Sequence, residues 1–294
     1  MKNVLVIGGT KYLGLELIKI LDKSKIIFFV ASRKRIEVDN FIKIDRKSQN
    51  DLNKLFIDNQ FDVVIDFINY SGLDSEILLN SISKQIKIPK LILISTVYTY
   101  ALPTDIDCDS IFKESSFKPL YYKNSILDRP DVTYSEGKRD MESYCIKNYS
   151  NNKLVILRYP IILGDNDYTN RTNFYIDKIK NRSQINPINI NSKSSYIFTS
   201  EAANSIVNFI KNEKHGIFNV SYDAISELNL IKLYCAYFDI KIESFINSSI
   251  ESTATPFSSN YDFIVDSNKY HNLHPTKNTF EGALNRELSK INKK

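Results

Sequence analysis

Residues 4–14 read VLVIGGTKYLG, and this stretch decides the fold class of the chain. Its first four residues are apolar, as in a strand buried on both faces, and residues 13–21 continue with the apolar spacing of a helix. Glycines between a strand and a helix let backbone amides approach a pyrophosphate, which the positive end of the helix dipole also favours. The stretch predicts a strand, a nucleotide-binding turn and a helix, with an ordinary tight turn as the alternative interpretation.

The turn supplies the first group of candidate cofactor-binding residues. These are Gly8, Thr10, Lys11, Tyr12, Leu13 and Gly14. Lys11 stands where a GxxGxxG pattern would have its middle glycine. Its ammonium group can contact a phosphate or point to solvent, and both interpretations stay open.

Apolar strands and amphipathic helices alternate along the first half of the chain. Apolar runs predict strands at residues 26–31, 41–44, 61–67, 91–94 and 154–158, and helical spacing predicts helices at 51–58, 75–86 and 134–148. Strands joined by helical crossovers form a parallel sheet that is covered on both faces. We therefore expect an α/β fold with a Rossmann-type, doubly wound parallel sheet, whose ligands bind beyond the carboxyl ends of the strands.

The second half of the chain is more polar and less regular. We assign residues 1–164 to an NAD(P)-binding Rossmann domain, to which segments near 195–220 return. Residues 165–294 are expected to form mainly a small C-terminal substrate-binding subdomain. Polar, unpatterned loops at 101–130 and 165–195 are expected to determine which substrate binds.

The composition is that of a globular chain, with 43% hydrophobic and 25% charged residues. The N-terminus lacks the features of a secretory signal, and no apolar run approaches the roughly 20 residues of a membrane span, so a cytoplasmic protein is expected. The net charge of +5 is spread along the chain, which suits phosphate-bearing ligands and is too weak to indicate nucleic acid. Neither a disulfide framework nor a metal site is predicted, because no CxxC spacing or histidine cluster accompanies Cys108, Cys145 and Cys235.

Basic residues follow the second predicted strand. Residues 32–35 read SRKR where an NAD-dependent enzyme would carry an acidic residue that bonds the adenosine ribose. A guanidinium group suits a 2′-phosphate, so Ser32, Arg33 and Arg35 favour NADP over NAD, with a solvated basic loop as the alternative. Asp45, just past the third strand, is placed either to meet the adenine amino group or to cap the next helix.

Three side chains form the candidate catalytic set. Thr96 follows the predicted strand 91–94, and Tyr134 and Lys138 stand one helical turn apart on one face. A tyrosine hydroxyl acts as a general acid or base when a nearby ammonium stabilises its phenolate, while a threonine hydroxyl holds the substrate oxygen. Glu142, a further turn along, is expected to belong to a solvent-side helix pair.

These features together resemble the extended and atypical short-chain dehydrogenase/reductases, the family of nucleotide-sugar epimerases, dehydratases and 4-keto reductases. The resemblance covers nearly the whole chain. Residues 157–164 are similar to the family's segment beside the nicotinamide, 195–203 to its F-I-x-V-x-D-x-A stretch, and 216–220 to its G-x-Y-N-V strand. Residues 9–14, 94–101 and 167–171 look closest to a subgroup that includes the chloroplast stem-loop-binding proteins, some of which bind RNA.

The resemblance implies roles for several residues. Thr96, Tyr134 and Lys138 would be the catalytic triad, with Tyr134 exchanging a proton as hydride moves to or from C4 of the nicotinamide. Tyr159 and Pro160 would pack beside the cofactor. Arg171 would lie either near a substrate diphosphate or in a structural salt bridge. Family members commonly dimerise through two helices each, so a homodimer through the helix 134–148 is expected.

The resemblance also narrows the reaction. Val97 and Tyr98 stand where dehydratases of the family carry an acidic pair, which disfavours a 4,6-dehydratase. What remains is a nucleotide-sugar keto-reductase that exchanges NADPH, slightly favoured by the basic residues 32–35, or an epimerase that retains NAD. A non-catalytic nucleotide- or RNA-binding protein is the alternative of a different class. The Tyr134 and Lys138 pair favours an enzyme, because a pure binding protein does not need it.

Overall fold

The computed structural model of the chain describes residues 2–100, 111–123, 132–242, 255, 259–275 and 278–292. Cys108 and part of the polar loop 101–130 lie outside the described residues. In the part of the chain that is described, no helix combines the length and the apolar character needed to cross a membrane.

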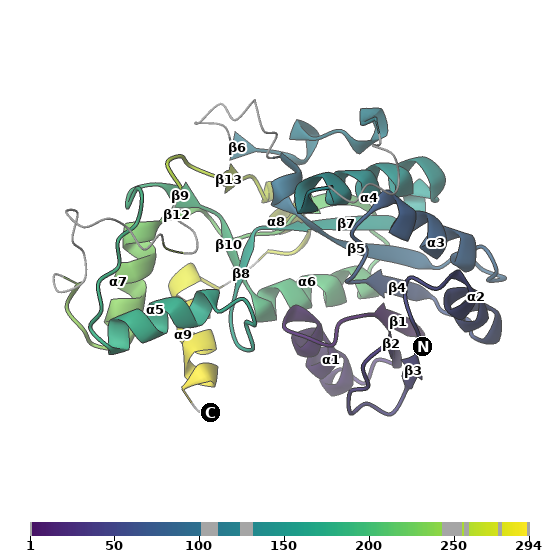
Figure 1. Cartoon of the computed structure of the whole chain (residues 1–294), viewed down its shortest axis with the longest axis horizontal. Helices are drawn as coiled ribbons and strands as arrows, with labels where there is room; N and C mark the ends of the chain where they lie inside the picture. The colour runs from purple at the N-terminus through teal and green to yellow at the C-terminus, as the bar shows by residue number, and fades with distance from the viewer. Residues whose placement is uncertain are drawn as a thin grey trace.

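A parallel sheet forms the centre of the molecule (Figure 1). Within the described residues, seven strands join in the order β11-β7-β5-β4-β1-β2-β3, and every neighbouring pair is parallel. The strands are β1 (Val4–Ile7), β2 (Phe28–Ser32), β3 (Phe41–Lys43), β4 (Val63–Asp66), β5 (Lys90–Thr96), β7 (Leu154–Tyr159) and β11 (Gly216–Asn219). The strand order reverses between β1 and β4, which confirms the predicted doubly wound Rossmann sheet.

Alternation along the strands divides the core into two layers. Val4 and Val6 of β1 face one hydrophobic cluster, whereas Leu5 and Ile7 face another on the opposite side of the sheet. The helices α1 (Leu13–Lys23) and α6 (Thr199–Lys211) cover the first face, and α2 (Gln49–Asp58), α3 (Gly72–Ile82) and α4 (Tyr134–Asn148) cover the second. Because strands buried on both faces carry apolar residues at every position, the apolar runs predicted them well.

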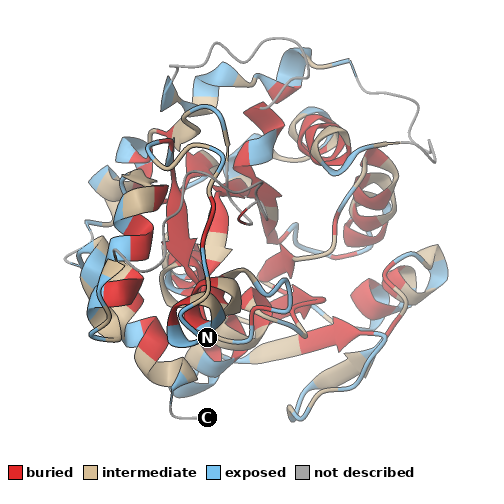
Figure 2. Cartoon of the chain, turned by 60° about the vertical axis from the view of Figure 1, so that its left-hand side comes forward, coloured by how far each residue is buried: buried red, intermediate tan, exposed pale blue. Residues whose placement is uncertain are grey.

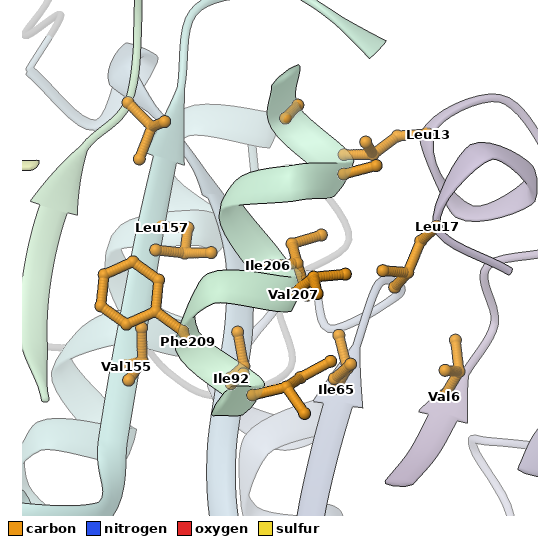
Figure 3. Close-up of a cluster of buried hydrophobic side chains, with 14 of the residues drawn as sticks. Val6, Leu13, Leu17, Ile65, Ile92, Val155, Leu157, Ile206, Val207 and Phe209 are labelled. Atoms are coloured by element: carbon orange, nitrogen blue, oxygen red, sulfur yellow. The ribbon is translucent and has the colours of Figure 1, made fainter. Parts of the chain in front are cut away.

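The first layer joins segments that are far apart in the sequence. Figure 3 shows Leu13 and Leu17 of α1 pointing toward α6, where Ile206 and Val207 meet them. Burying each such aliphatic side chain contributes roughly 1.5–3 kcal/mol. The amino-terminal strand, glycine turn and helix are therefore fixed in part by a helix about 190 residues later in the chain, which positions the turn on a rigid base.

The helix α3 differs from its predicted bounds of residues 75–86. It begins at Gly72, because the Ser71 side chain caps it by accepting a hydrogen bond from the backbone N–H of Asp74, and it ends at Ile82. Ile86 continues the apolar spacing of four but is 94% exposed beyond the helix end. The spacing rule therefore extended the helix by one turn too many, and it missed the serine cap at the start.

A smaller unit lies beside the sheet, at the left of Figure 1. It has its own hydrophobic cluster, built largely from aromatic and aliphatic residues of three helices. The helices are α5 (Arg171–Lys180), α7 (Glu227–Tyr237) and α9 (Phe280–Ile291), and two short strand pairs accompany them, β8 (Ile161–Leu163) with β10 (Tyr196–Phe198) and β9 (Lys193–Ser194) with β12 (Ile225–Ser226). Both α6 and β11, from residues 199–219, belong to the large sheet layers instead.

Short elements complete the described chain. They are β6 (Ile111–Phe112), which pairs with β13 (Ile264–Val265), the helix α8 (Asn268–Leu273), and the 3₁₀ helices η1 (Val97–Tyr100), η2 (Glu114–Ser116), η3 (Pro119–Tyr121) and η4 (Asn151–Lys153). Figure 2 shows that buried residues concentrate in the strands and on the inward faces of the helices. The polar residues that remain buried at the carboxyl ends of the strands are thus exceptions that need a physical reason.

Candidate active site

A cavity of about 580 Å³ opens beyond the carboxyl ends of the strands. Its volume lies within the usual range for sites that bind small molecules or cofactors. Nine of the residues predicted from the sequence line it, namely Gly8, Thr10, Lys11, Tyr12, Leu13, Ser32, Arg33, Tyr134 and Lys138. The cavity therefore brings the glycine turn, the basic loop and the candidate catalytic helix to one place.

The glycine turn is shaped by close backbone approach. Gly8 and Gly9 have φ values of +79° and +66°, which favour glycine. A Cβ atom on Gly14 would lie 2.2 Å from the Cα of Gly9, so α1 can meet the turn only because Gly14 has no side chain. Within the described residues no side chain caps the start of α1 at Tyr12. This tight cradle and uncapped helix start fit the pyrophosphate of a dinucleotide.

Lys11 and Tyr12 meet a residue from the far side of the cavity. The Lys11 ammonium lies 5.4 Å from the ring centroid of Tyr168, and the Tyr12 ring contacts the same ring edge-to-face at 6.2 Å. The Tyr12 hydroxyl donates a 2.7 Å hydrogen bond to the carbonyl of Ile162. The glycine turn is therefore connected directly to the segment that follows β8.

The residues of the basic loop after β2 differ in whether they line the cavity. The Ser32 hydroxyl donates to the carbonyl of Lys34 at 2.6 Å, which holds the loop in a tight turn. Arg33 and Lys34 are exposed and line the cavity, whereas Arg35 lies over the ring of Phe41 at 5.7 Å and does not line it. Arg33 is consequently better placed than Arg35 to meet a ligand phosphate.

The residues after β3 take different directions. The Asp45 carboxylate accepts a hydrogen bond from the backbone N–H of Lys47 and does not line the cavity, and Ser48 rather than Asp45 caps α2. The next residue, Arg46, is buried, lines the cavity and forms a 2.8 Å ion pair with Asp66. Sequence reasoning missed Arg46; its position two residues after the predicted strand 41–44 was the available signal.

Tyr134 begins α4 and Lys138 lies one turn further along it, as predicted. Thr133 caps this helix, and a capping box with Glu136 fixes its first turn. Lys138 is 1% exposed, and its ammonium donates hydrogen bonds of 2.7 Å to the carbonyls of Asn69 and Ile94. The same ammonium lies 5.9 Å from the Tyr134 ring centroid. Two backbone carbonyls, one from the segment after β4 and one from β5, therefore hold the cation beside the candidate acid.

Gly137 makes this arrangement possible. A Cβ atom at Gly137 would lie 2.2 Å from the backbone oxygen of Tyr70, so α4 approaches the segment after β4 more closely than a larger residue would allow. The Tyr70 ring in turn lies 4.7 Å from the Lys138 ammonium and 6.2 Å from the Tyr134 ring. Tyr70, which the sequence analysis did not select, thus completes the wall of the cavity at this end.

Thr96 ends β5 next to Tyr134. Its hydroxyl oxygen accepts a 3.2 Å hydrogen bond from the backbone N–H of Tyr98, and a side-chain hydrogen bond links it to Tyr134. The Tyr134 side chain is 55% exposed, yet desolvation of its hydroxyl and the neighbouring Tyr70 and Tyr168 raise its pKa to about 12, although Thr96 opposes this shift. Burial lowers the pKa of Lys138 to about 8. At neutral pH the Tyr134 hydroxyl therefore carries its proton, as a general acid must.

Glu142 does not face solvent, contrary to the sequence-based expectation. It is 0% exposed and forms a 2.6 Å ion pair with Arg158, which is also 0% exposed. Glu142 also accepts a 2.5 Å hydrogen bond from the hydroxyl of Ser95, and Arg158 donates to the Tyr100 hydroxyl at 2.8 Å. The expectation was wrong because it assumed a surface helix, whereas α4 packs on the sheet, where a buried charge needs polar or charged partners.

The remaining predicted residues lie apart from the cavity lining. Tyr159 and Pro160 are buried, and the Tyr159 hydroxyl bonds the Ser205 hydroxyl at 2.6 Å on the α6 side of the sheet. Arg171 begins α5, and its charge lowers the pKa of both Tyr12 and Tyr134 against the stronger effect of burial. Arg171 is therefore near Tyr12 and Tyr134, although it does not itself line the cavity.

Comparisons with known proteins agree with this geometry. A sequence model of the NAD dependent epimerase/dehydratase family matches residues 4–221. The chain therefore belongs to the NAD dependent epimerase/dehydratase family. A search of curated protein sequences gives no significant match.

Solved structures of similar fold cover almost the whole chain. One is a dTDP-glucose 4,6-dehydratase from Bacillus anthracis in complex with NAD, with a TM-score of 0.75 and 14% identity over 100% of this chain and 97% of that one. A UDP-glucose 4-epimerase from Thermus thermophilus in complex with NAD has a TM-score of 0.74 and 15% identity, with 99% of each chain covered. A dTDP-4-dehydrorhamnose reductase from Clostridium acetobutylicum has a TM-score of 0.70 and 15% identity, again with 99% of each covered. At these identities the likeness establishes the fold.

Proposed function

We propose that the chain is an NADPH-dependent keto-reductase that acts on a nucleotide sugar. The observation that carries this proposal is that Tyr134 and Lys138 line one end of a cavity whose middle is a glycine turn, with Thr96 beside Tyr134. The three proteins of similar fold named above act, by their titles, on dTDP- or UDP-linked sugars. Their shared substrate class supports a nucleotide sugar here.

The proposed reduction uses each residue of the triad in a distinct way. A bound nicotinamide would supply the hydride to the carbonyl carbon of the substrate. The Thr96 hydroxyl holds the substrate oxygen, and the protonated Tyr134 hydroxyl donates its proton to that oxygen. The Lys138 ammonium, fixed by two backbone carbonyls, stabilises the phenolate that remains.

Different residues support the binding of the dinucleotide and the binding of its 2′-phosphate. The glycine turn and the uncapped start of α1 suit the pyrophosphate of either NAD or NADP. The exposed guanidinium of Arg33 on the cavity wall supports NADPH, because it suits a 2′-phosphate. Ser32, Arg35 and Asp45 remain candidates for weaker contributions at the same end.

The smaller unit is proposed to bind the sugar nucleotide. Arg171, close to Tyr134 and Tyr12, is the candidate for contact with its diphosphate. In this proposal Tyr159 and Pro160 pack beside the cofactor. A homodimer through α4 remains a prediction.

An epimerase that retains NAD is the second candidate. Two of the three similar structures contain NAD, and one of these is an epimerase by its title. The same triad serves either reaction, because an epimerase also moves a proton at a sugar hydroxyl. A non-catalytic binding protein is the third candidate, which the buried placement of Lys138 disfavours, since an unneeded buried cation destabilises a fold.

Mass spectrometry of small molecules released on denaturation, paired with NADPH and NADH titration of the native protein, tests these candidates. The keto-reductase proposal predicts little retained cofactor and tighter binding of NADPH. Retained NAD would favour the epimerase. Binding of neither dinucleotide would contradict both enzymatic proposals and support a non-catalytic protein.

A further inference from the structure

The ring of Tyr70 lies against the buried ammonium group of Lys138. The ammonium nitrogen lies over this ring, 4.7 Å from its centroid, and is closer to it than to the centroid of the Tyr134 ring at 5.9 Å. A cation within about 6 Å of the face of an aromatic ring is attracted to the ring, most strongly where the cation is removed from water. Because Lys138 is 1% exposed, its contact with Tyr70 is of the stronger kind.

Backbone contacts fix the segment that carries Tyr70. The backbone N–H of Tyr70 donates a 2.9 Å hydrogen bond to the Asp74 carboxylate, in the first turn of α3. The carbonyl of the preceding residue, Asn69, accepts the 2.7 Å hydrogen bond from the Lys138 ammonium. On the other side Gly137 brings α4 close to the backbone oxygen of Tyr70. The Tyr70 ring therefore extends from a segment that is tied to both helices and to the cation itself.

Charged groups on the surrounding elements also act on the Lys138 ammonium. Asp66 of β4, Asp74 of α3 and Glu142 of α4 favour its charged form, whereas Arg46, after β3, opposes it. Among the described residues, no carboxylate lies within ion-pair distance of this ammonium. Burial outweighs the carboxylates and lowers the pKa of Lys138 to about 8. The carboxylates thus act from a distance, and the tyrosine ring is in direct contact.

We propose that Tyr70 is a positioning residue whose ring face holds the Lys138 ammonium beside Tyr134 and keeps it charged. This inference rests on the proposed function, in which the ammonium stabilises the phenolate that Tyr134 leaves after it donates its proton. A neutral amine at Lys138 gives that phenolate no such stabilisation. Because a cation is attracted to the face of a ring, the role belongs to the Tyr70 ring and not to its hydroxyl group.

Two substitutions separate the ring face from the space that the ring fills. Tyr70→Phe keeps the face, whereas Tyr70→Leu keeps an apolar side chain without it. We expect the titration midpoint of Lys138 to fall by about 0.5–1 pH unit in Tyr70→Leu and to stay in place in Tyr70→Phe. A ring that only filled space would give the opposite direction in Tyr70→Leu, because a smaller side chain admits water, which favours the charged ammonium.

Carbon-13 NMR of the lysine ε-methylene groups measures this midpoint without cofactor or substrate. The resonance of Lys138 is the one that is absent from the spectrum of Lys138→Met, and circular dichroism checks that each variant is folded. A trifluorinated phenylalanine at position 70 keeps the shape of the ring but weakens the negative charge of its face, so the midpoint should fall here too. This variant provides the result if Tyr70→Leu does not fold. An unchanged or higher midpoint in the variants that lose the charged face would overturn the inference, and so would an equal fall in Tyr70→Phe.

The pH profile of turnover connects the contact to the reaction. Turnover should decline at high pH as Lys138 loses its proton, and this decline should move to lower pH in Tyr70→Leu by the same amount as the NMR midpoint. It should stay at the same pH in Tyr70→Phe. A shifted midpoint with an unmoved profile would overturn the positioning role. If the unsubstituted chain is active while the NMR test fails, only this inference falls; if it binds no dinucleotide, the proposed function falls, whatever the midpoint does.

Discussion

Charged residues are buried near one end of the cavity and exposed at the other. Beside α4, Lys138, Glu142 and Arg158 are buried, and backbone carbonyls or an opposite charge satisfy each of them. At the end of β2, Arg33 and Lys34 are exposed to solvent. A buried charge has a fixed position and is costly to leave unpaired, whereas an exposed charge adjusts freely and contributes little to stability. Substitutions should therefore disturb the fold at the first end and change only ligand preference at the second.

The largest effect is expected from Glu142→Ala. The substitution leaves the guanidinium of Arg158 buried without its carboxylate, which costs about 3–5 kcal/mol of folding free energy. Urea unfolding followed by circular dichroism measures this loss. The double variant Glu142→Ala with Arg158→Met removes the stranded charge and should recover part of the stability. If Glu142→Ala lost no more folding free energy than a surface substitution does, the pair of Glu142 and Arg158 would not be what stabilises this end of the cavity.

A smaller effect is expected from Gly137→Ala. The new methyl group would meet the Tyr70 backbone oxygen at 2.2 Å, so α4 must move away, at a cost of roughly 1–3 kcal/mol. Gly282→Ala in α9 is the matched control, since its nearest neighbour is the side-chain oxygen of Thr279 at 3.2 Å. Urea unfolding of both variants provides the comparison. Equal stability of the two would mean that close packing of α4 is not needed.

The pH dependence of stability tests the burial of Lys138. Burial lowers the pKa of Lys138 to about 8, whereas an unfolded lysine titrates near pH ~10.4. Between these values the unfolded chain binds more protons, so this residue makes stability rise with pH, by at most about 1.4 kcal/mol per pH unit. Subtracting the stability of Lys138→Met at several pH values across this window isolates the contribution. A difference that does not change with pH would contradict the buried ammonium.

The smallest effect is expected at the exposed end. Arg33→Ala should weaken NADPH binding about tenfold, or ~1.4 kcal/mol, and leave NADH binding nearly unchanged, because only NADPH carries the 2′-phosphate. Arg35→Ala is the matched control and should have less effect, since Arg35 lies over the Phe41 ring outside the cavity wall. Fluorescence titration gives the four dissociation constants. Equal losses for both cofactors in Arg33→Ala would remove the argument for NADPH.

Sequence patterns predicted the parts of the molecule that local periodicity governs. The apolar runs found the strands of the sheet except β11, which only the family resemblance indicated, and the helix 134–148 was predicted with the bounds of α4. The same patterns extended α3 to Ile86, because apolar spacing alone does not reveal where a helix leaves the sheet.

Such patterns could not predict which polar residues are buried or how they pair. Glu142 and Arg158 stand 16 residues apart, and only the packing of α4 on β7 brings their charges together. Arg46 and Asp66 likewise meet through tertiary structure, from the ends of two strands that do not pair. A charged residue in sequence looks the same on a surface and in a buried pair, so burial had to come from the fold.

The most direct test of the account is the rate of cofactor oxidation by Tyr134→Phe with nucleotide 4-keto sugars, measured beside its NADPH affinity. The account predicts that this variant binds NADPH nearly as well as the unsubstituted chain and loses turnover by about 10²-fold or more, because the proton donor is gone. Tyr121→Phe, at an exposed position, is the control and should keep its rate. Turnover by Tyr134→Phe at the unsubstituted rate would contradict the account.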